Sequence, residues 1–416
     1  MEPSTNSERA VQNRIIKLLQ DYNGYDYLGN FKDTENGNII EDILRKYLLE
    51  NQNLTGPQAT EAINKLKADA SCPSQESLYN SNKDVYNTLR YPMPVSQGSG
   101  LPNKQVMLID WKNPDNNIFS VAEEVTVRKQ TVDAEHRRPD VVVYINGIAV
   151  AVIELKKATV SVEDGINQNW RNQQQGQIPQ FYSTMQLLMA GSESEGVYYG
   201  TTLTPPKFYL HWKEPAGEGY PYDNAGIPVS SSIYGQKEFP NELDRSLIQM
   251  LEPNRLLEFL HDCVVFDGGV KKVARPNQYF AIVAAKTRIE SKQSGIIWHS
   301  QGSGKSLTMV WLAQWIRENV EDSRVVIITD RDELDKQITT GFADAGENPV
   351  RAKSGNHLIS MLNGKGKDGN ASLICTLIHK FGIAGDSRGD ETKDKSLRGN
   401  RSPEQYLRDL AEQLPD

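Results

Sequence analysis

The sequence has few cysteines, no long apolar run and no apolar leader. Its three cysteines lie far apart, with no CxxC pair and no histidine at metal-ligand spacing, which argues against a disulfide framework and a zinc site. No stretch approaches the roughly 18 uninterrupted apolar residues that a membrane span requires, and residues 1–10 are too polar for the core of a signal peptide. We therefore expect a cytoplasmic protein with no membrane partner.

The remaining composition is that of an ordinary globular protein. Hydrophobic residues make up 38% of the chain and charged residues 24%, which is the balance of a chain that folds rather than one that stays disordered. The 416 residues have room for two or three domains with sizeable cores. The formal net charge of -8 does not exclude DNA as a partner, because local basic clefts decide such contacts.

The first part of the chain predicts two helices and then a β-hairpin. Apolar residues recur at helical spacing over 9–19 and 39–49, and extended structure is expected from about residue 117. The strongest local pattern is DVVVYINGIAVAVIELKK at 140–157, in which Asn146-Gly147 separates two β-branched runs. This dipeptide favours a type I′ turn and hence a hairpin.

The second part predicts an α/β fold. The Gly- and Pro-rich stretch 213–242 is typical of a loop or domain edge. Beyond it, strand patterns at 295–299, 324–330 and 372–378 alternate with a helical pattern at 305–319. Strands that alternate with helices predict a parallel sheet that is covered on both faces.

Three residues of the predicted hairpin form the first candidate site. Asp140 begins its first strand, Glu154 ends the second, and Lys156 follows on the same side of the pleat. Two carboxylates with the Leu155 carbonyl are the hard oxygen ligands that Mg²⁺ prefers, and a neighbouring lysine can steady negative charge, so the chemistry predicted is phosphodiester hydrolysis. The alternative is an ordinary ion pair at the edge of a sheet.

A phosphate-binding loop is the second candidate site. The segment HSQGSGKSL at 299–307 follows an apolar run and opens an amphipathic helix, which is the setting that a phosphate loop requires. Flexible glycines let backbone N–H groups face a phosphate, a lysine reaches the terminal phosphates, and a serine hydroxyl can bind Mg²⁺. The alternative is a Gly-Ser surface turn. The candidate ATP ligands in this loop are Gly302, Ser303, Gly304, Lys305 and Ser306.

The hairpin segment RRPDVVVYINGIAVAVIELKK resembles the PD-(D/E)xK nuclease motif of the restriction subunit of type I restriction-modification enzymes. The resemblance implies a PD-(D/E)xK nuclease domain over residues 1–260, with Asp140, Glu154 and Lys156 catalytic. A QxxxY helix follows the lysine in that family; Gln168 matches the glutamine, and Asn172 stands in place of the tyrosine. Glu8 is either a supporting acid or an ordinary charge at a helix start.

The second half resembles the first motor domain of superfamily 2 helicases and translocases. In RPNQYFAI, Gln278 matches the residue that reads adenine, about 20 residues before the phosphate loop, and segments 325–338 and 376–381 are similar to later motor segments. Asp330 and Arg331 would contact DNA or simply precede a helix cap. No DExH or DEAD tetrad follows Ser306, so residues 261–416 are expected to be an incomplete RecA-like domain and the chain a fragment of a longer subunit.

Together the resemblances imply a Mg²⁺-dependent DNA endonuclease coupled to an ATP-driven translocase. The complete enzyme would move along double-stranded DNA while bound to methyltransferase and specificity subunits. Two alternatives remain: a non-catalytic module that binds DNA or partner subunits, and a repair-type helicase-nuclease.

Overall fold

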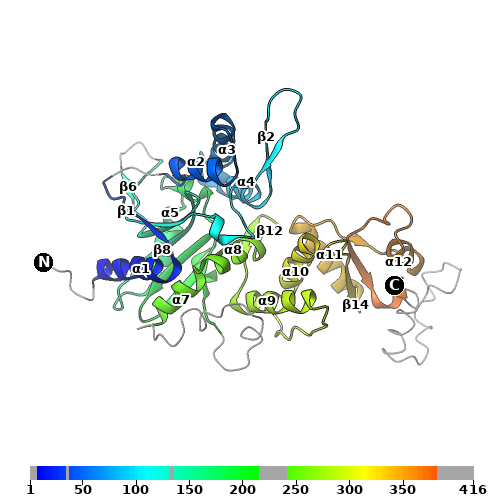
Figure 1. Cartoon of the computed structure of the whole chain (residues 1–416). Coiled ribbons are helices and arrows are strands. Elements are labelled where there is room, and N and C mark those ends of the chain that lie inside the picture. The colour runs from blue at the N-terminus through cyan, green and yellow to red at the C-terminus, as the bar shows by residue number, and fades with distance from the viewer. Residues whose placement is uncertain (1–6, 34–36, 131–134, 215–240, 382–416) are drawn as a thin grey trace. The chain divides into compact units, whose positions relative to one another are not determined.

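The computed structural model describes residues 7–33, 37–130, 135–214 and 241–381, and the chain forms two compact units that divide between Ile297 and Trp298 (Figure 1). Most of the loop predicted at 213–242 lies outside the described residues.

The first unit extends further along the chain than the domain predicted to end at residue 260. The segment after 260 packs onto the first unit, because the Tyr199 hydroxyl donates to the Ala274 carbonyl over 2.7 Å and the Trp212 ring lies 5.8 Å from that of Tyr279. The unit boundary at 297 therefore follows aromatic packing that the sequence pattern does not reveal.

A mixed seven-stranded sheet forms the centre of the first unit. Its strand order is β1-β4-β7-β8-β9-β10-β11, in which β1/β4 and β8/β9 pair in parallel and the other neighbours are antiparallel. All residues of the three adjacent strands β4, β7 and β8 are buried, so the candidate hairpin lies at the core. The strands are β1 (Asp26–Asn30), β4 (Phe119–Glu123), β7 (Val141–Ile145), β8 (Ile148–Lys156), β9 (Leu187–Ser192), β10 (Gly196–Gly200) and β11 (Leu210–His211).

Helices cover this sheet and extend beyond it. The first and seventh helices lie side by side (Figure 1), joined by the ion pair of Arg14 with Asp244, while the fifth crosses β8 and β9. The helices are α1 (Glu8–Asn23), α2 (Glu41–Glu50), α3 (Gly56–Asp69), α4 (Leu78–Arg90), α5 (Val162–Asn172), α7 (Glu242–Met250), α8 (Pro253–Asp262) and α9 (Pro276–Glu290). The helices predicted over 9–19 and 39–49 are confirmed as α1 and α2.

In the described part of the first unit there are also three small hairpins and four short 3-10 turns. The hairpins pair β2 (Met93–Val95) with β3 (Lys104–Val106), β5 (Val127–Arg128) with β6 (His136–Arg137), and β12 (Val264–Asp267) with β13 (Val270–Val273). The 3-10 turns are η1 (Gln75–Ser77), η2 (Pro114–Asn116), η3 (Pro179–Ser183) and η4 (Pro206–Phe208).

The predicted type I′ hairpin is confirmed by the turn between β7 and β8. Both central residues have positive φ, 53° at Asn146 and 79° at Gly147, as this turn requires. A Cβ on Gly147 would also lie 2.5 Å from the Ile40 carbonyl oxygen. Glycine is therefore needed at this position for its conformation and for its lack of a side chain.

The second unit contains a parallel three-stranded sheet, as the alternation of strands and helices predicts. Its order is β14-β16-β15, with both pairs parallel, and α10 and α11 pack against β14. Its elements are α10 (Lys305–Asn319), β14 (Val325–Thr329), α11 (Asp332–Asp344), β15 (Val350–Arg351), α12 (Gly355–Leu362), β16 (Leu373–Leu377) and η6 (Ile378–Phe381).

The strand predicted at 295–299 is wrong. In the described part of the chain these residues pair with no strand, and Ile296 and Trp298 are 87% and 92% exposed. An apolar β-branched sequence favours a strand only where a neighbouring strand takes up its backbone N–H and C=O groups. The sequence shows the preference but not whether such a neighbour is present.

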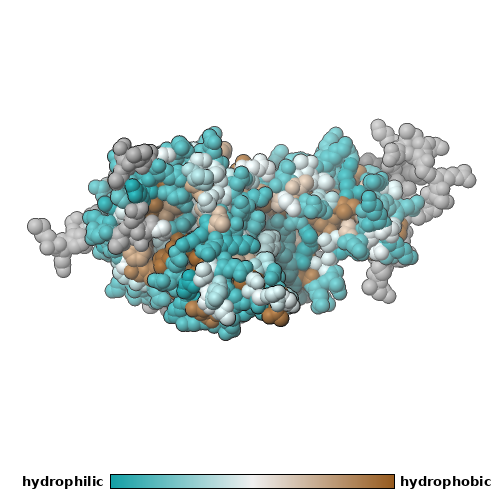
Figure 2. Space-filling model, turned by 90° about the horizontal axis from the view of Figure 1, so that it is seen from above, coloured by the Kyte–Doolittle hydropathy of each residue, from teal (hydrophilic) through white to brown (hydrophobic). Residues whose placement is uncertain are grey.

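The face of the molecule in Figure 2 is largely hydrophilic, with small apolar groups set among polar side chains. Within the described ranges, no helix combines the length and apolar character needed to cross a bilayer.

Candidate active site

The hairpin of β7 and β8 brings Asp140, Glu154 and Lys156 together, as the sequence predicts. Val141 pairs with Ile153, so Asp140, one residue before β7, faces Glu154. The Leu155 N–H donates to Asp140 Oδ2 over 2.8 Å, and Lys156 Nζ lies 3.6 Å from the same oxygen. The hairpin register thus holds two carboxylates and an ammonium group in one cluster.

Glu154 is fully buried, and neither of its carboxylate oxygens has a hydrogen-bond partner. Burial, and then the negative charge of Asp140, raise its pKa well above 4.5. A buried carboxylate without donors is costly, and a bound cation is one way to offset that cost. The orphaned oxygens of Glu154 therefore fit a metal ligand.

Helix α5 covers Glu154 because a glycine faces the strand. A Cβ on Gly165 would lie 3.3 Å from the Glu154 Cβ and 3.1 Å from the Ala190 Cβ. With no side chain at this position, the helix can pack directly against β8 and exclude water from the carboxylate. The local sequence VEDGIN gives no hint of this contact, which depends on tertiary packing.

Lys156 is held by three oxygen atoms. Its Nζ donates to Glu8 Oε1 over 3.0 Å and to the Leu155 carbonyl over 3.2 Å, and lies near Asp140. Burial alone would lower its pKa, but Asp140 and then Glu154 outweigh burial and raise it. The pKa of Asp140 is also raised, because burial outweighs the favourable charge of Lys156. The ammonium form of Lys156 is therefore the stable one.

Glu8 is placed by the start of α1. The Ser7 hydroxyl caps the helix by accepting from the Ala10 N–H, and the next residue, Arg9, pairs with buried Glu123 over 2.6 Å. The same Glu123 oxygen also accepts from Tyr27 Oη over 2.7 Å. Sequence reasoning missed Glu123, because its importance comes from long-range contacts of a strand end rather than from a motif.

Gln168 and Asn172 lie on α5, the helix that follows Lys156, as the resemblance implies. Gln168 is half-buried, and no hydrogen bond joins it to the carboxylate cluster among the described residues. Asn172 is 1% exposed and points into the core. The structure therefore places Gln168 on the helix that covers Glu154 but does not bring its side chain into the cluster.

Buried tyrosines complete the surroundings of Glu154. Burial, and then the charge of Glu154, raise the pKa of Tyr182 well above 10 and also raise that of Tyr209. Both rings belong to parts of the chain far from the hairpin, and no pattern in the sequence associates them with it. Their burial around Glu154 disfavours the charged form of a carboxylate that has no partner.

The phosphate loop lies in the second unit, directly before α10. Gly302 and Gly304 have φ values of 76° and 85°, which glycine adopts without strain. Lys305 is exposed, and its Nζ donates to the Ser300 carbonyl over 2.9 Å. The Ser303 hydroxyl donates to the same carbonyl over 2.7 Å. The loop thus curls before a helix start, as the sequence predicts, while Ser306 takes the second position of α10.

Gln278 is in the first unit, at the start of α9. It is 2% exposed, and its Oε1 accepts from the Arg275 N–H over 2.9 Å in a capping box. Its side chain therefore stabilises a helix start, and a role in binding adenine stays a prediction.

Asp330 and Arg331 connect β14 to α11 and lie 3.4 Å apart as an exposed ion pair. The next residue, Asp332, is the first of α11 and pairs with Lys336 over 2.7 Å. Arg331 is the N-cap residue of α11, and a contact of this turn with DNA stays a prediction.

Comparisons with known proteins match two separate regions of the chain. Residues 5–207 match the family model described as type I restriction enzyme R protein N terminus, and residues 277–404 match that of the SWI2/SNF2 ATPase. These matches confirm the resemblance to the restriction subunit of type I restriction-modification enzymes and to a motor ATPase in the second half of the chain.

Two curated relatives are similar to most of the chain. A Methanocaldococcus jannaschii protein named as the MjaIXP endonuclease subunit of a type I restriction enzyme is 28% identical over 91% of this chain and 37% of its own length. The HindI endonuclease subunit of Haemophilus influenzae is 24% identical over 74% of this chain and 29% of its own length. The chain thus spans about a third of the length of these relatives.

Proposed function

Because residues 5–207 belong to the family of type I restriction enzyme R protein N termini, we propose that the first unit is a metal-dependent DNA endonuclease of the PD-(D/E)xK type. The observation that carries this proposal is the fully buried Glu154 carboxylate, whose oxygens have no protein donor, beside Asp140 and Lys156. A structural ion pair would satisfy those oxygens. A cation site requires them to be available.

Asp140 and Glu154 would hold Mg²⁺, with the Leu155 carbonyl close by. Bound there, the ion would polarise a phosphoryl oxygen and lower the pKa of a water molecule. The residues of the chain supply the rest. Helix α5 and the buried tyrosines exclude bulk water, and the N–H of Leu155 fixes Asp140 through a 2.8 Å hydrogen bond.

Lys156 would stabilise the negative charge that develops on the phosphoryl group. Its ammonium form is favoured by the two carboxylates, and Glu8 fixes its direction through a 3.0 Å bond. A fixed cation in a partly dry site lowers the energy of a charged transition state without reorganisation. Gln168, on the covering helix, would support the cluster only after a side-chain movement or through bound DNA.

The second unit would bind ATP through its phosphate loop. Backbone N–H groups around Gly302, Ser303 and Gly304 would face the phosphates, and Lys305 would exchange its bond to the Ser300 carbonyl for the terminal phosphates. Ser306 would contribute a hydroxyl to Mg²⁺. The match to an ATPase family over residues 277–404 supports this role.

In the complete protein, ATP-driven movement along double-stranded DNA would bring the nuclease to its cutting position. The names of the relatives, which are endonuclease subunits of restriction enzymes, support a multi-subunit assembly. Its other members would be methyltransferase and specificity subunits, as the resemblance implies. Sequence recognition would then belong to the partners, because the candidate site contains only groups that bind metal and phosphate.

Cleavage of supercoiled plasmid with Mg²⁺ or Mn²⁺ tests the nuclease proposal. We expect metal-dependent nicking by the wild-type chain and none by Glu154→Ala. The exposed Lys157→Ala variant is the matched control. If the chain requires translocation for cutting, a calorimetric Mn²⁺ titration still distinguishes the cases. Binding that Glu154→Ala leaves unchanged would favour a non-catalytic module.

A further inference from the structure

The β5–β6 hairpin carries basic side chains on both faces, and the two faces differ in whether those side chains have partners. Val127 pairs with Arg137 and Arg128 with His136, and residues opposite each other in an antiparallel pair share a face. One face therefore carries Arg128, His136 and Arg138, all of them exposed. We call these three residues the basic face.

The opposite face of the hairpin is neutralised and packed. Lys129 forms an ion pair with Glu135, Val127 is buried, and Arg137 Nε donates to Gln177 Oε1 over 2.8 Å. No carboxylate of the described residues pairs with any member of the basic face. In a chain with a net charge of -8, this local group of basic side chains is distinctive, and no acidic side chain among the described residues pairs with it.

One arginine of the basic face is held in a fixed direction. Arg138 Nε donates to the Thr126 hydroxyl over 3.0 Å, and that hydroxyl donates in turn to the Lys32 carbonyl over 2.8 Å. The other guanidinium N–H groups of Arg138 remain available. An oriented guanidinium loses less entropy when it binds an anion, and its fork matches the oxygens of a phosphate.

The basic face continues into the candidate active site. The Val125 N–H donates to the Pro139 carbonyl over 3.2 Å and the Glu124 N–H to the Asp140 carbonyl over 2.9 Å. The two segments that form the hairpin therefore remain paired as far as Asp140. Arg138 precedes Asp140 by two residues, which span at most about 7 Å. Successive charges on one DNA strand rise only about 3.4 Å along the helix axis.

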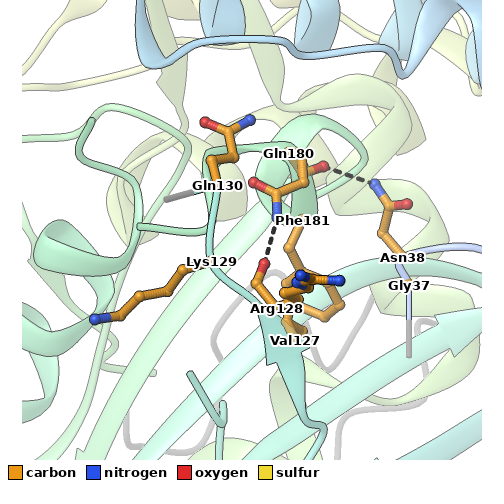
Figure 3. A pocket seen from close by; sticks show the side chains of 8 residues that line it. All are labelled: Gly37, Asn38, Val127, Arg128, Lys129, Gln130, Gln180 and Phe181. Atoms are coloured by element: carbon orange, nitrogen blue, oxygen red, sulfur yellow. Dashed lines mark hydrogen bonds between the residues drawn. The ribbon is translucent and has the colours of Figure 1, made fainter. Parts of the chain in front are cut away.

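A pocket of about 570 Å³ opens beside Arg128, lined by side chains of the hairpin and of η3 (Figure 3). Gln180 donates through Nε2 to the Arg128 carbonyl over 2.8 Å and fixes this wall. The lining contains Arg128 and Lys129 but no acidic residue. The pocket therefore offers space next to the basic face, and Arg128 is the lining cation that has no acidic partner among the described residues.

We propose that the basic face of Arg128, His136 and Arg138 binds the sugar-phosphate backbone of duplex DNA, within a few phosphates of the one at Asp140 and Glu154. This inference rests on the proposed nuclease function, whose substrate it positions. The contact is independent of base sequence, because side chains that bind phosphate oxygens carry no information about the bases. It sets the strand in register with the carboxylates.

The salt dependence of DNA binding tests the proposal. Binding of a short fluorescein-labelled duplex to the full chain is measured by anisotropy in EDTA, where cleavage cannot interfere. Each lost phosphate contact lowers the slope of log K against log salt by about 0.9. For the double variant Arg128→Ala/Arg138→Ala, we expect the magnitude of this slope to fall by about 1.8. We also expect it to bind DNA roughly 30- to 100-fold more weakly near 0.1 M salt.

Arg245→Ala is the matched control, because Arg245 is an exposed arginine of α7 with no acidic partner in the described chain. The double variant Arg128→Lys/Arg138→Lys, which retains both charges, should keep most of the slope, and it separates loss of charge from misfolding. A double alanine variant with the slope of the wild type and of Arg245→Ala would overturn the proposal.

The outcomes also separate this inference from the nuclease function. If the double alanine variant loses slope but the chain neither cuts DNA nor binds Mn²⁺ through Glu154, the basic face stands and the nuclease proposal fails. If Glu154→Ala abolishes cutting while the double alanine variant keeps its slope, the nuclease stands and the basic face falls.

Discussion

The carboxylate cluster of the first unit and the phosphate loop of the second have opposite surroundings. Glu154 lies in the middle of a seven-stranded sheet, fully buried beneath α5. Lys305 is exposed, and the apolar residues before its loop, Ile296 and Trp298, are exposed and pair with no strand of the described chain. All three residues of the first candidate site belong to one unit, whereas the residues before the candidate phosphate loop pair with no strand of the described chain.

The difference shows what each motif needs in order to work. A carboxylate site depends on desolvation and fixed charge, which the fold of one unit can supply. A phosphate loop depends on backbone N–H groups and on the strand and helix that hold them. We therefore expect the first unit to bind metal without help and the second to be sensitive to whatever pairs with residues 295–298.

The largest expected effect is the loss of cleavage in Lys156→Ala. Removing the fixed cation takes away stabilisation of the charged transition state, so the rate of metal-dependent plasmid cleavage should fall roughly 10²–10³-fold. Lys157→Ala, which removes an exposed neighbouring charge, should retain the wild-type rate. Equal rates in Lys156→Ala and wild type would show that the cluster is not catalytic.

A substitution in the phosphate loop tests whether the two candidate sites are independent. Lys305→Ala should weaken ATP binding about tenfold or more, because the lysine reaches the terminal phosphates, and should leave Mn²⁺ binding by the first unit unchanged. Equilibrium dialysis with labelled ATP and calorimetry with Mn²⁺ measure the two effects. A simultaneous loss of both would mean that the two sites are not separate.

The pH dependence of stability tests the burial of Glu154. Its folded pKa is raised above the unfolded value of 4.5, so the stability gained from its protonation is complete below that value and is lost as pH rises towards the folded pKa. In metal-free buffer each pH unit in this window costs about 1.4 kcal/mol of unfolding free energy. Chemical denaturation of Glu154→Gln should show a clearly smaller decline with pH, and an identical decline would contradict the assignment.

Two glycines in helices sharpen the contrast between the units. Gly165→Ala places a Cβ against Glu154 and Ala190, so α5 must shift. We expect Mn²⁺ affinity to fall about three- to tenfold, which is a loss of roughly 1 kcal/mol of binding free energy. Gly341, on α11, has nothing within 4 Å of its Cβ position. Gly341→Ala should raise the unfolding free energy by about 0.5–1 kcal/mol, with Mn²⁺ affinity unchanged.

The smallest effect is expected at the start of α1. Arg9→Ala removes the ion pair with Glu123 and loosens the turn that directs Glu8 to Lys156. Because Arg9 is partly exposed, the cost is about 0.2–1 kcal/mol, or up to about fivefold in cleavage rate. Arg9→Lys should recover part of the loss. A rate for Arg9→Ala that equals the wild type would show that Glu8 needs no such support.

Local patterns predicted the elements that determine both candidate sites. The Asn146-Gly147 turn fixes the hairpin, and a one-residue shift of the pairing between Val143 and Tyr144 then places Asp140 opposite Glu154. The turn follows from the local sequence, whereas the shift does not. The phosphate loop also follows from local sequence, because its glycines and the helix after it are neighbours along the chain.

Tertiary contacts account for what the sequence did not reveal. Gly165, Tyr182 and Glu123 come from segments far from the hairpin, and only the packing of the whole unit brings them to it. The strand prediction at 295–299 was wrong for a related reason, because it too depends on tertiary contacts. Strand formation there requires a partner strand, and a propensity in one segment says nothing about whether another segment lies beside it.

A calorimetric Mn²⁺ titration of the wild-type chain and of Glu154→Gln at two pH values tests the central claim most directly. We predict one Mn²⁺ ion bound by the wild type, with an affinity that rises with pH as the Glu154 proton is released, and little or no binding by Glu154→Gln. Equal Mn²⁺ binding by both proteins at both pH values would contradict the account of Glu154 as a buried metal ligand.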